Sequence, residues 1–185
     1  MRGDLLEQHV QYIAHQCNAT RDATLLPHEA PKFRGAARTL AGKVFRKFPW
    51  SLICLGVPVA DCKLRAGKAT IHGDGVSQRF VVNLFGQLDK GWGNKQGKRR
   101  AAWAAGLRND HGADDSKSRR LQFFTQALAD FEAQALAAGV PLTSVAFPER
   151  IGCGVAGGDW AEYRAVIERF QLRNPRVRVV LVRWG

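Results

Sequence analysis

The chain has 185 residues, of which 45% are hydrophobic, so it is long enough to bury a core without disulfide bonds. Its formal net charge of +12 at pH 7 attracts polyanions, either nucleic acid or phosphorylated small molecules. No apolar run is long enough to span a bilayer, and the opening "MRGDLLEQHV" lacks the apolar core of a secretory signal, so we expect a cytoplasmic protein with no membrane partner.

The first half of the chain alternates between short strands and one helix. The stretch "YIAHQCN" at residues 12–18 predicts a short, mostly buried strand that ends at a polar residue, followed by a proline-bearing loop. Apolar side chains share one helical face over residues 34–48, which predicts a basic amphipathic helix ending before Pro49. "KATIHGDG" predicts a strand that runs into a turn, and "RFVVNLFG" at residues 79–86 predicts a central strand.

The second half contains a polar insert and two further helices. Residues 87–116 are polar, glycine-rich and basic, and they predict either an ordered insert or a mobile lid. Apolar residues repeat at helical spacing from Leu121 to Ala135, and the strand "TSVAF", a glycine loop, a helix at residues 159–170 and the strand "VRVVLV" follow. This alternation indicates an α/β layered sheet in one domain over residues 1–185.

The glycine loop has the spacing of a nucleotide-binding turn. In "IGCGVAGGDW", Gly152, Gly154 and Gly157 form G-x-G-x-x-G between a predicted strand and a predicted helix. A Rossmann site also needs an acidic residue after the next strand, and no Asp or Glu follows Glu168, which excludes that fold. The glycines still let the backbone approach a phosphate, which its amides and the next helix N-terminus would attract. Asp159 suits a helix N-cap as well as a chemical role.

Five segments together resemble a macrodomain. They occur in the order and spacing of that family and cover most of the chain: "GDLL" at residues 3–6, "YIAHQCNA" at 12–19, "GAARTLAGKVFRKFP" at 35–49, "VVNLFGQ" at 81–87 and "AFPERIGCGVAGGDW" at 146–160. The last is the most specific. The similarity is greatest to the branch that processes ADP-ribose-1″-phosphate and contains terminal ADP-ribose glycohydrolases. It implies a three-layer α/β/α fold with a central mixed sheet and an ADP-ribose cleft.

The resemblance also implies a role for individual residues. It assigns the adenine to Asp4 and the amide of Leu5, and the distal ribose to Asn18. Gly35 and Ala36 would lie against the distal ribose and the phosphates. The diphosphate would be wrapped by the second loop, which consists of Gly152, Cys153, Gly154, Val155, Ala156, Gly157 and Gly158.

The sequence departs from the glycohydrolase pattern at three places. The family's lysine after the "VVNLFGQ" strand is replaced by Gly86 and Gln87, with Lys90 later, and its aspartate after "GCG" is replaced by Ala156. A covalent lysine adduct is therefore not expected. The "GD" pair comes almost directly after Met1, so we also expect the family's first strand to be missing or truncated.

Three functional hypotheses follow from the resemblance and the charge. The first is an ADP-ribose-binding protein that hydrolyses a derivative at the distal ribose, with Asn18, Asp159 and Lys90 as candidates for proton transfer and charge stabilisation. The second is a non-catalytic module that reads or sequesters ADP-ribose-like ligands. The third is a protein that acts on ADP-ribosylated nucleic acid through basic segments such as "KQGKRR" at residues 95–100 and "KSRR" at 117–120.

The cysteines and histidines do not predict a metal site or a cofactor. Cys17, Cys54, Cys62 and Cys153 lack zinc-ligand spacing, so we expect reduced thiols. A packing role for Cys153 is favoured over that of a nucleophile, because no base is paired with it in the sequence. His15 is interpreted as a buried hydrogen-bonding residue.

Overall fold

The computed structural model describes residues 3–19, 39–52, 66–88 and 114–183, and all structural statements below concern these ranges. Helices and 3₁₀ turns (η) alternate with strands in the order η1 (Leu5–Glu7), β1 (Tyr12–Asn18), α1 (Leu40–Lys47), η5 (Pro49–Ser51), β2 (Ala69–His72), β3 (Phe80–Gln87), α3 (Lys117–Ala137), β4 (Ser144–Pro148), α4 (Trp160–Arg173) and β5 (Arg178–Val182).

The five strands form one mixed sheet, as the sequence predicts. Their order is β2-β3-β1-β4-β5, in which β2 runs antiparallel to β3 and the other neighbours are parallel. Most residues of the parallel strands β1 and β4 are buried, which is typical of strands covered on both faces. After β1, the next two strands, β2 and β3, lie on one side of it, and the last two, β4 and β5, lie on the other. The strand order therefore reverses at β1, which is the switch point of the sheet.

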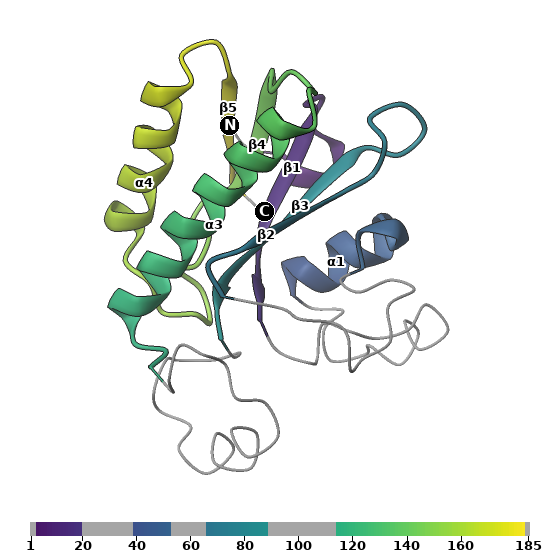
Figure 1. The fold of residues 1–185 in the computed structure, drawn as a ribbon. Helices are drawn as coiled ribbons and strands as arrows, with labels where there is room; N and C mark the ends of the chain where they lie inside the picture. The colour runs from purple at the N-terminus through teal and green to yellow at the C-terminus, as the bar shows by residue number, and fades with distance from the viewer. Residues whose placement is uncertain (1–2, 20–38, 53–65, 89–113, 184–185) are drawn as a thin grey trace.

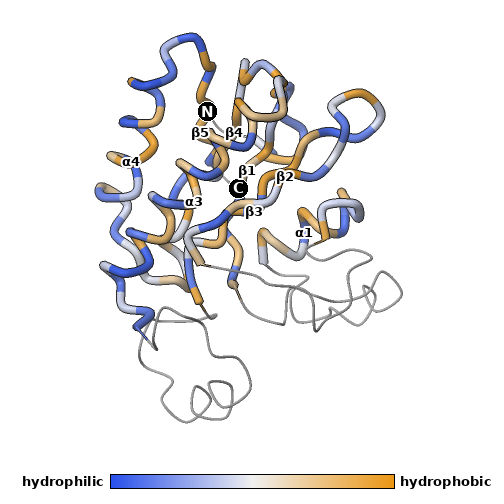
Figure 2. Tube along the Cα trace, in the orientation of Figure 1, coloured by the Kyte–Doolittle hydropathy of each residue, from blue (hydrophilic) through white to orange (hydrophobic). Residues whose placement is uncertain are grey.

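Helices cover both faces of the sheet and complete the predicted three layers. Figure 1 shows α3 and α4 side by side on one face and α1 on the other. Alternate residues of β1 enter different cores: Tyr12 and Ala14 pack with α3 and α4, whereas Ile13 and Cys17 pack with α1. Figure 2 shows apolar strands inside and hydrophilic residues along α3 and α4, which fits helices that bury only one face.

Side-chain caps fix where the helices begin. Thr39 accepts from the Gly42 amide at the start of α1, and Ser116 accepts from the Arg119 amide at the start of α3. The helix predicted at residues 34–48 begins at Leu40 in the described part, because residues 20–38 lie outside it.

The predicted insert is only partly described. Gln87 belongs to β3 rather than to the insert, and residues 89–113 lie outside the described ranges, as do the basic residues 95–100. In the ranges that the structure describes, no helix is long and apolar enough to cross a membrane. Within those ranges Cys17 and Cys153 are both free thiols, whereas Cys54 and Cys62 lie outside them.

Candidate functional site

The carboxyl ends of three parallel strands meet at one edge of the sheet. β1, β3 and β4 end there with Asn18, Gln87 and Pro148. Ligands of open α/β sheets bind outside the carboxyl ends of the strands, where the strand order reverses. This edge, next to the switch strand β1, is therefore where a ligand site is expected.

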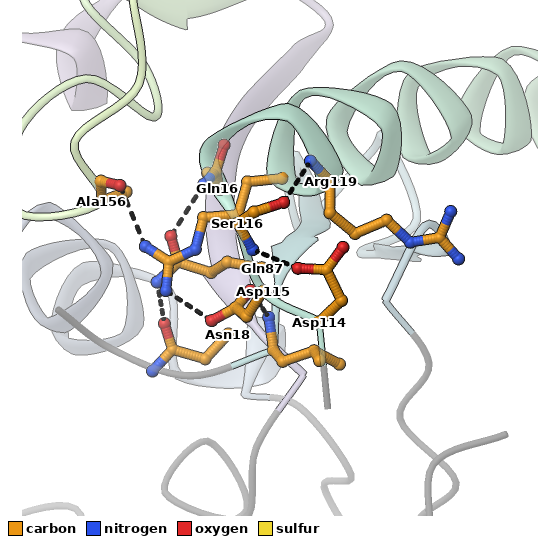
Figure 3. A network of polar contacts seen from close by, with 10 residues as sticks. Gln16, Asn18, Gln87, Asp114, Asp115, Ser116, Arg119 and Ala156 are labelled. Carbon is orange, nitrogen blue, oxygen red and sulfur yellow. Dashed lines mark hydrogen bonds and ion pairs between the residues drawn. The ribbon is translucent and has the colours of Figure 1, made fainter. Parts of the chain in front are cut away.

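A β-bulge near the end of β3 brings Gln87 beside Asn18. Gln16 pairs with Leu84, yet Asn18 pairs with Gln87, so β3 has one extra residue between these pairs. Because side chains alternate along a regular strand, the extra residue turns Gln87 to the face on which Gln16 and Asn18 lie. Gln16 Nε2 donates to Gln87 Oε1 at 2.8 Å, and Gln87 Nε2 donates to Asn18 Oδ1 at 2.6 Å (Figure 3). The bulge thus creates a row of three amides, the amide relay, at the carboxyl edge.

Two glycines make room for the first member of this relay. A Cβ atom on Gly86 would lie 2.7 Å from Gln16 Cδ, and one on Gly152 would lie 2.8 Å from Gln16 Oε1. Both distances are shorter than a non-bonded contact allows. Gln16 is therefore seated between β3 and the loop that follows β4.

The glycine loop, residues 152–158, is a series of tight turns closed by its own backbone. The Gly157 amide donates to Gly154 O, and the Gly158 amide donates to Gly152 O, each at 3.0 Å. Gly152 and Gly157 have φ values of +71° and +72°, which residues with a Cβ atom rarely adopt. The loop geometry therefore depends on glycine at these two positions.

The glycine loop packs against the ring of Tyr163 in α4. This ring would lie 2.3 Å from a Cβ atom on Gly152 and 2.6 Å from one on Gly158, so both glycines pack directly on it. The side chain is 1% exposed, and its hydroxyl has no hydrogen-bond partner in the described part of the chain. Burial raises the pKa of Tyr163 to about 12, so the hydroxyl keeps its proton.

The tip of the loop presents backbone amides without an intramolecular acceptor. In the part of the chain that the structure describes, this holds for the N–H groups of Gly154, Val155 and Ala156. Gly154 and Val155 are exposed, Val155 at 67%, whereas Ala156 is buried, with 9% of its surface exposed. Free amides close to a helix N-terminus favour an anion. The phosphate-binding role expected from the glycines stays a prediction.

Asp159 caps the helix that follows the loop, as its position predicts. Its Oδ1 accepts from the Ala161 amide at 2.8 Å and from the Glu162 amide at 3.3 Å. Its Oδ2 receives no intramolecular hydrogen bond from the described residues, and the side chain is exposed. The capping role therefore leaves one carboxylate oxygen for a ligand or water.

A buried ion pair connects the site to α3. Arg120 donates to Asp115 Oδ2 at 2.5 Å and to the carbonyl of Ala156 at 2.9 Å, and Asp115 Oδ1 accepts from the Leu88 amide. The two charged side chains are 2% and 3% exposed. Arg120 of the basic "KSRR" segment is therefore not available for a contact at the surface, since its helical position faces the core and its charge is paired.

The remaining titratable groups near the loop are poor nucleophiles. Burial raises the pKa of the Cys153 thiol to about 11, and its Sγ donates to the carbonyl of Ile151. This supports the packing role predicted for Cys153. His15 is fully buried with its Nε2 2.7 Å from Asn83 Oδ1, as the sequence interpretation expects. The described residues contain no cluster of three or more metal-ligating side chains.

The structure places Asp4 at the same edge as the glycine loop. The Gly3 amide lies 3.5 Å from the carbonyl oxygen of Arg183, which directly follows β5. Asp4 is exposed and caps η1 through a hydrogen bond from the Leu6 amide, and the Leu5 side chain is buried. No strand precedes η1 among the described residues. Gly35, Ala36 and Lys90 lie outside the described ranges.

Sequence reasoning missed several residues that shape the site: Gln16, Gln87, Asp115, Arg120 and Tyr163. A signal was present for some of them. Gln16 and Gln87 are polar residues within or at the end of apolar strands, and such residues need a partner when buried. Arg120 precedes Phe124 by four residues and so belongs to the apolar face of α3.

The comparisons with known proteins identify the fold. No family model matches the chain, and no curated protein matches it. Among solved structures, the macrodomain of Mycobacterium tuberculosis DarG has a TM-score of 0.65 at 14% identity, with 99% of this chain and 95% of that chain covered. The macrodomain of Thermus aquaticus DarG has a TM-score of 0.60 at 18% identity, with 98% and 94% covered.

A third structure contains a ligand. Thermosipho africanus DarTG in complex with ADP-ribose has a TM-score of 0.60 at 13% identity, and the match covers 99% of this chain and 40% of that chain. At sequence identities this low, the similarity to these structures shows the fold alone. The protein has a macrodomain fold, in agreement with the resemblance of its sequence motifs.

Proposed function

We propose that this protein binds ADP-ribose at the carboxyl edge of its sheet, with the diphosphate on the glycine loop. The observation that carries the proposal is the loop tip, where the amides of Gly154, Val155 and Ala156 have no acceptor in the described ranges. Three adjacent donors in the loop that precedes a helix N-terminus suit a diphosphate. The macrodomain fold and the ADP-ribose complex of Thermosipho africanus DarTG support this ligand over other diphosphates.

The two ends of the ligand would extend from the loop in opposite directions. Asp4, at the β5 side of the edge, would accept from the adenine amine. Asn18, at the end of β1, would face the distal ribose. Gly35 and Ala36 would complete the ribose and phosphate contacts. These assignments follow the family resemblance, and the common edge on which Asp4, Asn18 and the loop lie supports them.

Calorimetric titration with ADP-ribose, NAD and AMP tests the proposal. We expect ADP-ribose to bind most tightly, because AMP lacks the second phosphate and the distal ribose, and the nicotinamide of NAD has to fit beside Asn18. Asp4→Asn is expected to weaken ADP-ribose by about tenfold, since the adenine amine loses a charged acceptor. The absence of heat with all three ligands would contradict the proposal.

We further propose hydrolysis of an ADP-ribose derivative at the distal ribose, either a 1″-phosphate or an ADP-ribosyl ester or base linkage. The free Oδ2 of Asp159 favours this reaction, because a carboxylate beside the loop can orient or deprotonate water. Asn18 and Lys90 would stabilise developing charge. The alternative is a reader or sequestering module without turnover.

Asp159→Asn separates these two alternatives. Asparagine is as good an N-cap as aspartate, so the helix start and the ADP-ribose affinity are expected to be retained. If Asp159 takes part in hydrolysis, product formation from ADP-ribose-1″-phosphate and from ADP-ribosylated protein or nucleic acid falls by a factor of 10² or more. If the wild type binds ADP-ribose but forms no product from any of these substrates, the reader hypothesis is favoured.

The charge of the protein supports nucleic acid as a carrier of the ADP-ribosyl group. Lys117 and Arg119 lie in the first turn of α3, which starts at the site, and Lys117 is exposed. This hypothesis predicts that a plain single-stranded oligonucleotide binds at low salt and dissociates steeply as salt is raised. If the oligonucleotide does not bind at low salt, the nucleic-acid hypothesis is wrong.

A further inference from the structure

We propose that Gln16 and Gln87 are positioning residues that hold the Asn18 side chain with its NH₂ group toward the ligand. The inference rests on the proposed function, because it assigns to Asn18 a donor role at the distal ribose. It goes beyond that function by specifying what the site recognises there, namely an oxygen that accepts a hydrogen bond. Neither glutamine is assigned a role by the family resemblance.

The hydrogen bonds of the relay have one direction. Gln16 uses its nitrogen to donate to Gln87, and Gln87 uses its nitrogen to donate to the oxygen of Asn18. Each amide has a donor end and an acceptor end, so fixing one member of the row fixes the next. The Nδ2 of Asn18 is therefore directed out of the relay, and it has no acceptor in the described part of the chain.

Gln16 forms the buried end of the relay. Gln16 is confined between Gly86 and Gly152, where its Oε1 is buried and lacks a hydrogen-bond donor among the described residues. Tyr163 packs against the same glycine and keeps its hydroxyl proton because burial raises its pKa. Gln16 thus has its oxygen at the buried position and its nitrogen toward Gln87, which is the orientation that the relay transmits to Asn18.

The relay also connects two parts of the site that are far apart in sequence. Gln16 contacts the glycine loop at Gly152 and, through Gln87, determines the orientation of Asn18. Neither glutamine needs to contact the ligand for this effect. A change in the amide of Gln16 should therefore alter recognition at the distal ribose while leaving recognition of the nucleotide part intact.

Replacing either glutamine by glutamate reverses the relay. In Gln87→Glu, one carboxylate oxygen accepts from Gln16 and the other faces Asn18, so the Asn18 amide rotates and presents its oxygen to the ligand. In Gln16→Glu, the Gln87 amide rotates so that its nitrogen donates to the new carboxylate. The Asn18 amide then rotates in turn and again presents its oxygen to the ligand. We expect both variants to lose about tenfold in ADP-ribose affinity, the value of one hydrogen bond, and less than about threefold in ADP affinity.

ADP is the internal control, because it carries the adenine and the diphosphate but no distal ribose. Gln122→Glu, at an exposed position of α3, adds the same charge outside the relay and is expected to leave both affinities unchanged. Thermal unfolding verifies that each variant folds. Should a glutamate variant fail to fold, Gln87→Met removes the hydrogen bonds to Gln16 and Asn18 without adding charge and is expected to lose affinity for ADP-ribose alone.

A measurement without ligand keeps this inference separate from the proposed function. The Asn18 side-chain NH₂ resonances, identified by their loss in Asn18→Asp, are expected to shift downfield in Gln16→Glu, where this group becomes a donor to Gln87. If the resonances shift but the wild type binds no ADP-ribose, the relay is correct and the proposed function is wrong. Unchanged resonances, or equal losses for ADP-ribose and ADP in both variants, would overturn the relay.

Discussion

At the scale of single residues, the glycine loop contains glycines with two different tasks. Gly152 has a left-handed φ of +71°, and a Cβ atom there would lie 2.3 Å from Tyr163 Cε1. Gly154 has no such constraint, because a Cβ atom there meets nothing within 4 Å. The first glycine shapes the loop, and the second keeps its surface open. The spacing G-x-G-x-x-G does not distinguish these tasks.

Gly152→Ala and Gly154→Ala form a matched pair that tests this distinction. We expect Gly152→Ala to lower the free energy of unfolding by about 2–4 kcal/mol, about 1 from the left-handed backbone and the rest from overpacking against Tyr163. Gly154→Ala is expected to change it by less than about 0.5 kcal/mol and to weaken ADP-ribose, since its methyl group projects from the loop surface. Urea unfolding and calorimetry measure the two effects, and equal destabilisation by both variants would contradict this view.

At the scale of elements, the Asp115–Arg120 pair joins three of them. It connects the end of β3 through the Leu88 amide, the first turns of α3, and the glycine loop through the carbonyl of Ala156. The sequence does not contain this information in a local form, because the partners are 27 and 36 residues apart. The pair explains why a charged residue occupies the apolar face of α3.

Breaking the buried pair is expected to be costly. Asp115→Asn leaves the Arg120 charge buried without its counter-charge, which should lower the free energy of unfolding by about 3–5 kcal/mol. The exposed pair of Arg164 and Glu168 on α4 is the control, and its removal should cost less than about 0.5 kcal/mol. A double-mutant cycle of Asp115→Asn with Arg120→Met, followed by urea unfolding, measures the coupling. A coupling energy near zero would show that the two charges act independently.

The elements themselves were predictable, and the amide relay was not. The strand at residues 12–18 and the long helix beginning near Leu121 follow from apolar periodicity, which is a local property of the chain. The bulge in β3 depends on pairing between Asn18 and Gln87, 69 residues apart, and no local pattern marks it. The glycine loop lies between these cases: its tight turns were predictable from the glycine spacing, but its packing against Tyr163 and Gln16 was not.

At the scale of the whole molecule, one buried histidine links stability to pH. His15 lies in the centre of the sheet, fully buried, and burial lowers its pKa to about 4 from an ordinary value near 6.5. The folded protein therefore keeps the ring neutral at a pH where the unfolded chain is already protonated. Stability from this source is complete above pH 6.5 and is lost as the pH falls toward 4. Burial lowers the pKa of His72 as well, which acts in the same direction.

We expect the free energy of unfolding to fall by about 3 kcal/mol between pH 7 and pH 4 on account of His15, since each pKa unit corresponds to about 1.4 kcal/mol. Carboxylates such as Asp74, whose hydrogen bonds lower its pKa to about 2, lose their contribution at lower pH and do not mask the effect above pH 4.5. His15→Gln keeps a donor for Asn83 but cannot be protonated, so its unfolding free energy should depend less on pH across this window. Urea unfolding at half-unit steps of pH gives both slopes. Equal slopes for the wild type and His15→Gln would mean that another group controls acid unfolding, whereas a flatter slope in the variant assigns it to the histidine at the centre of the sheet.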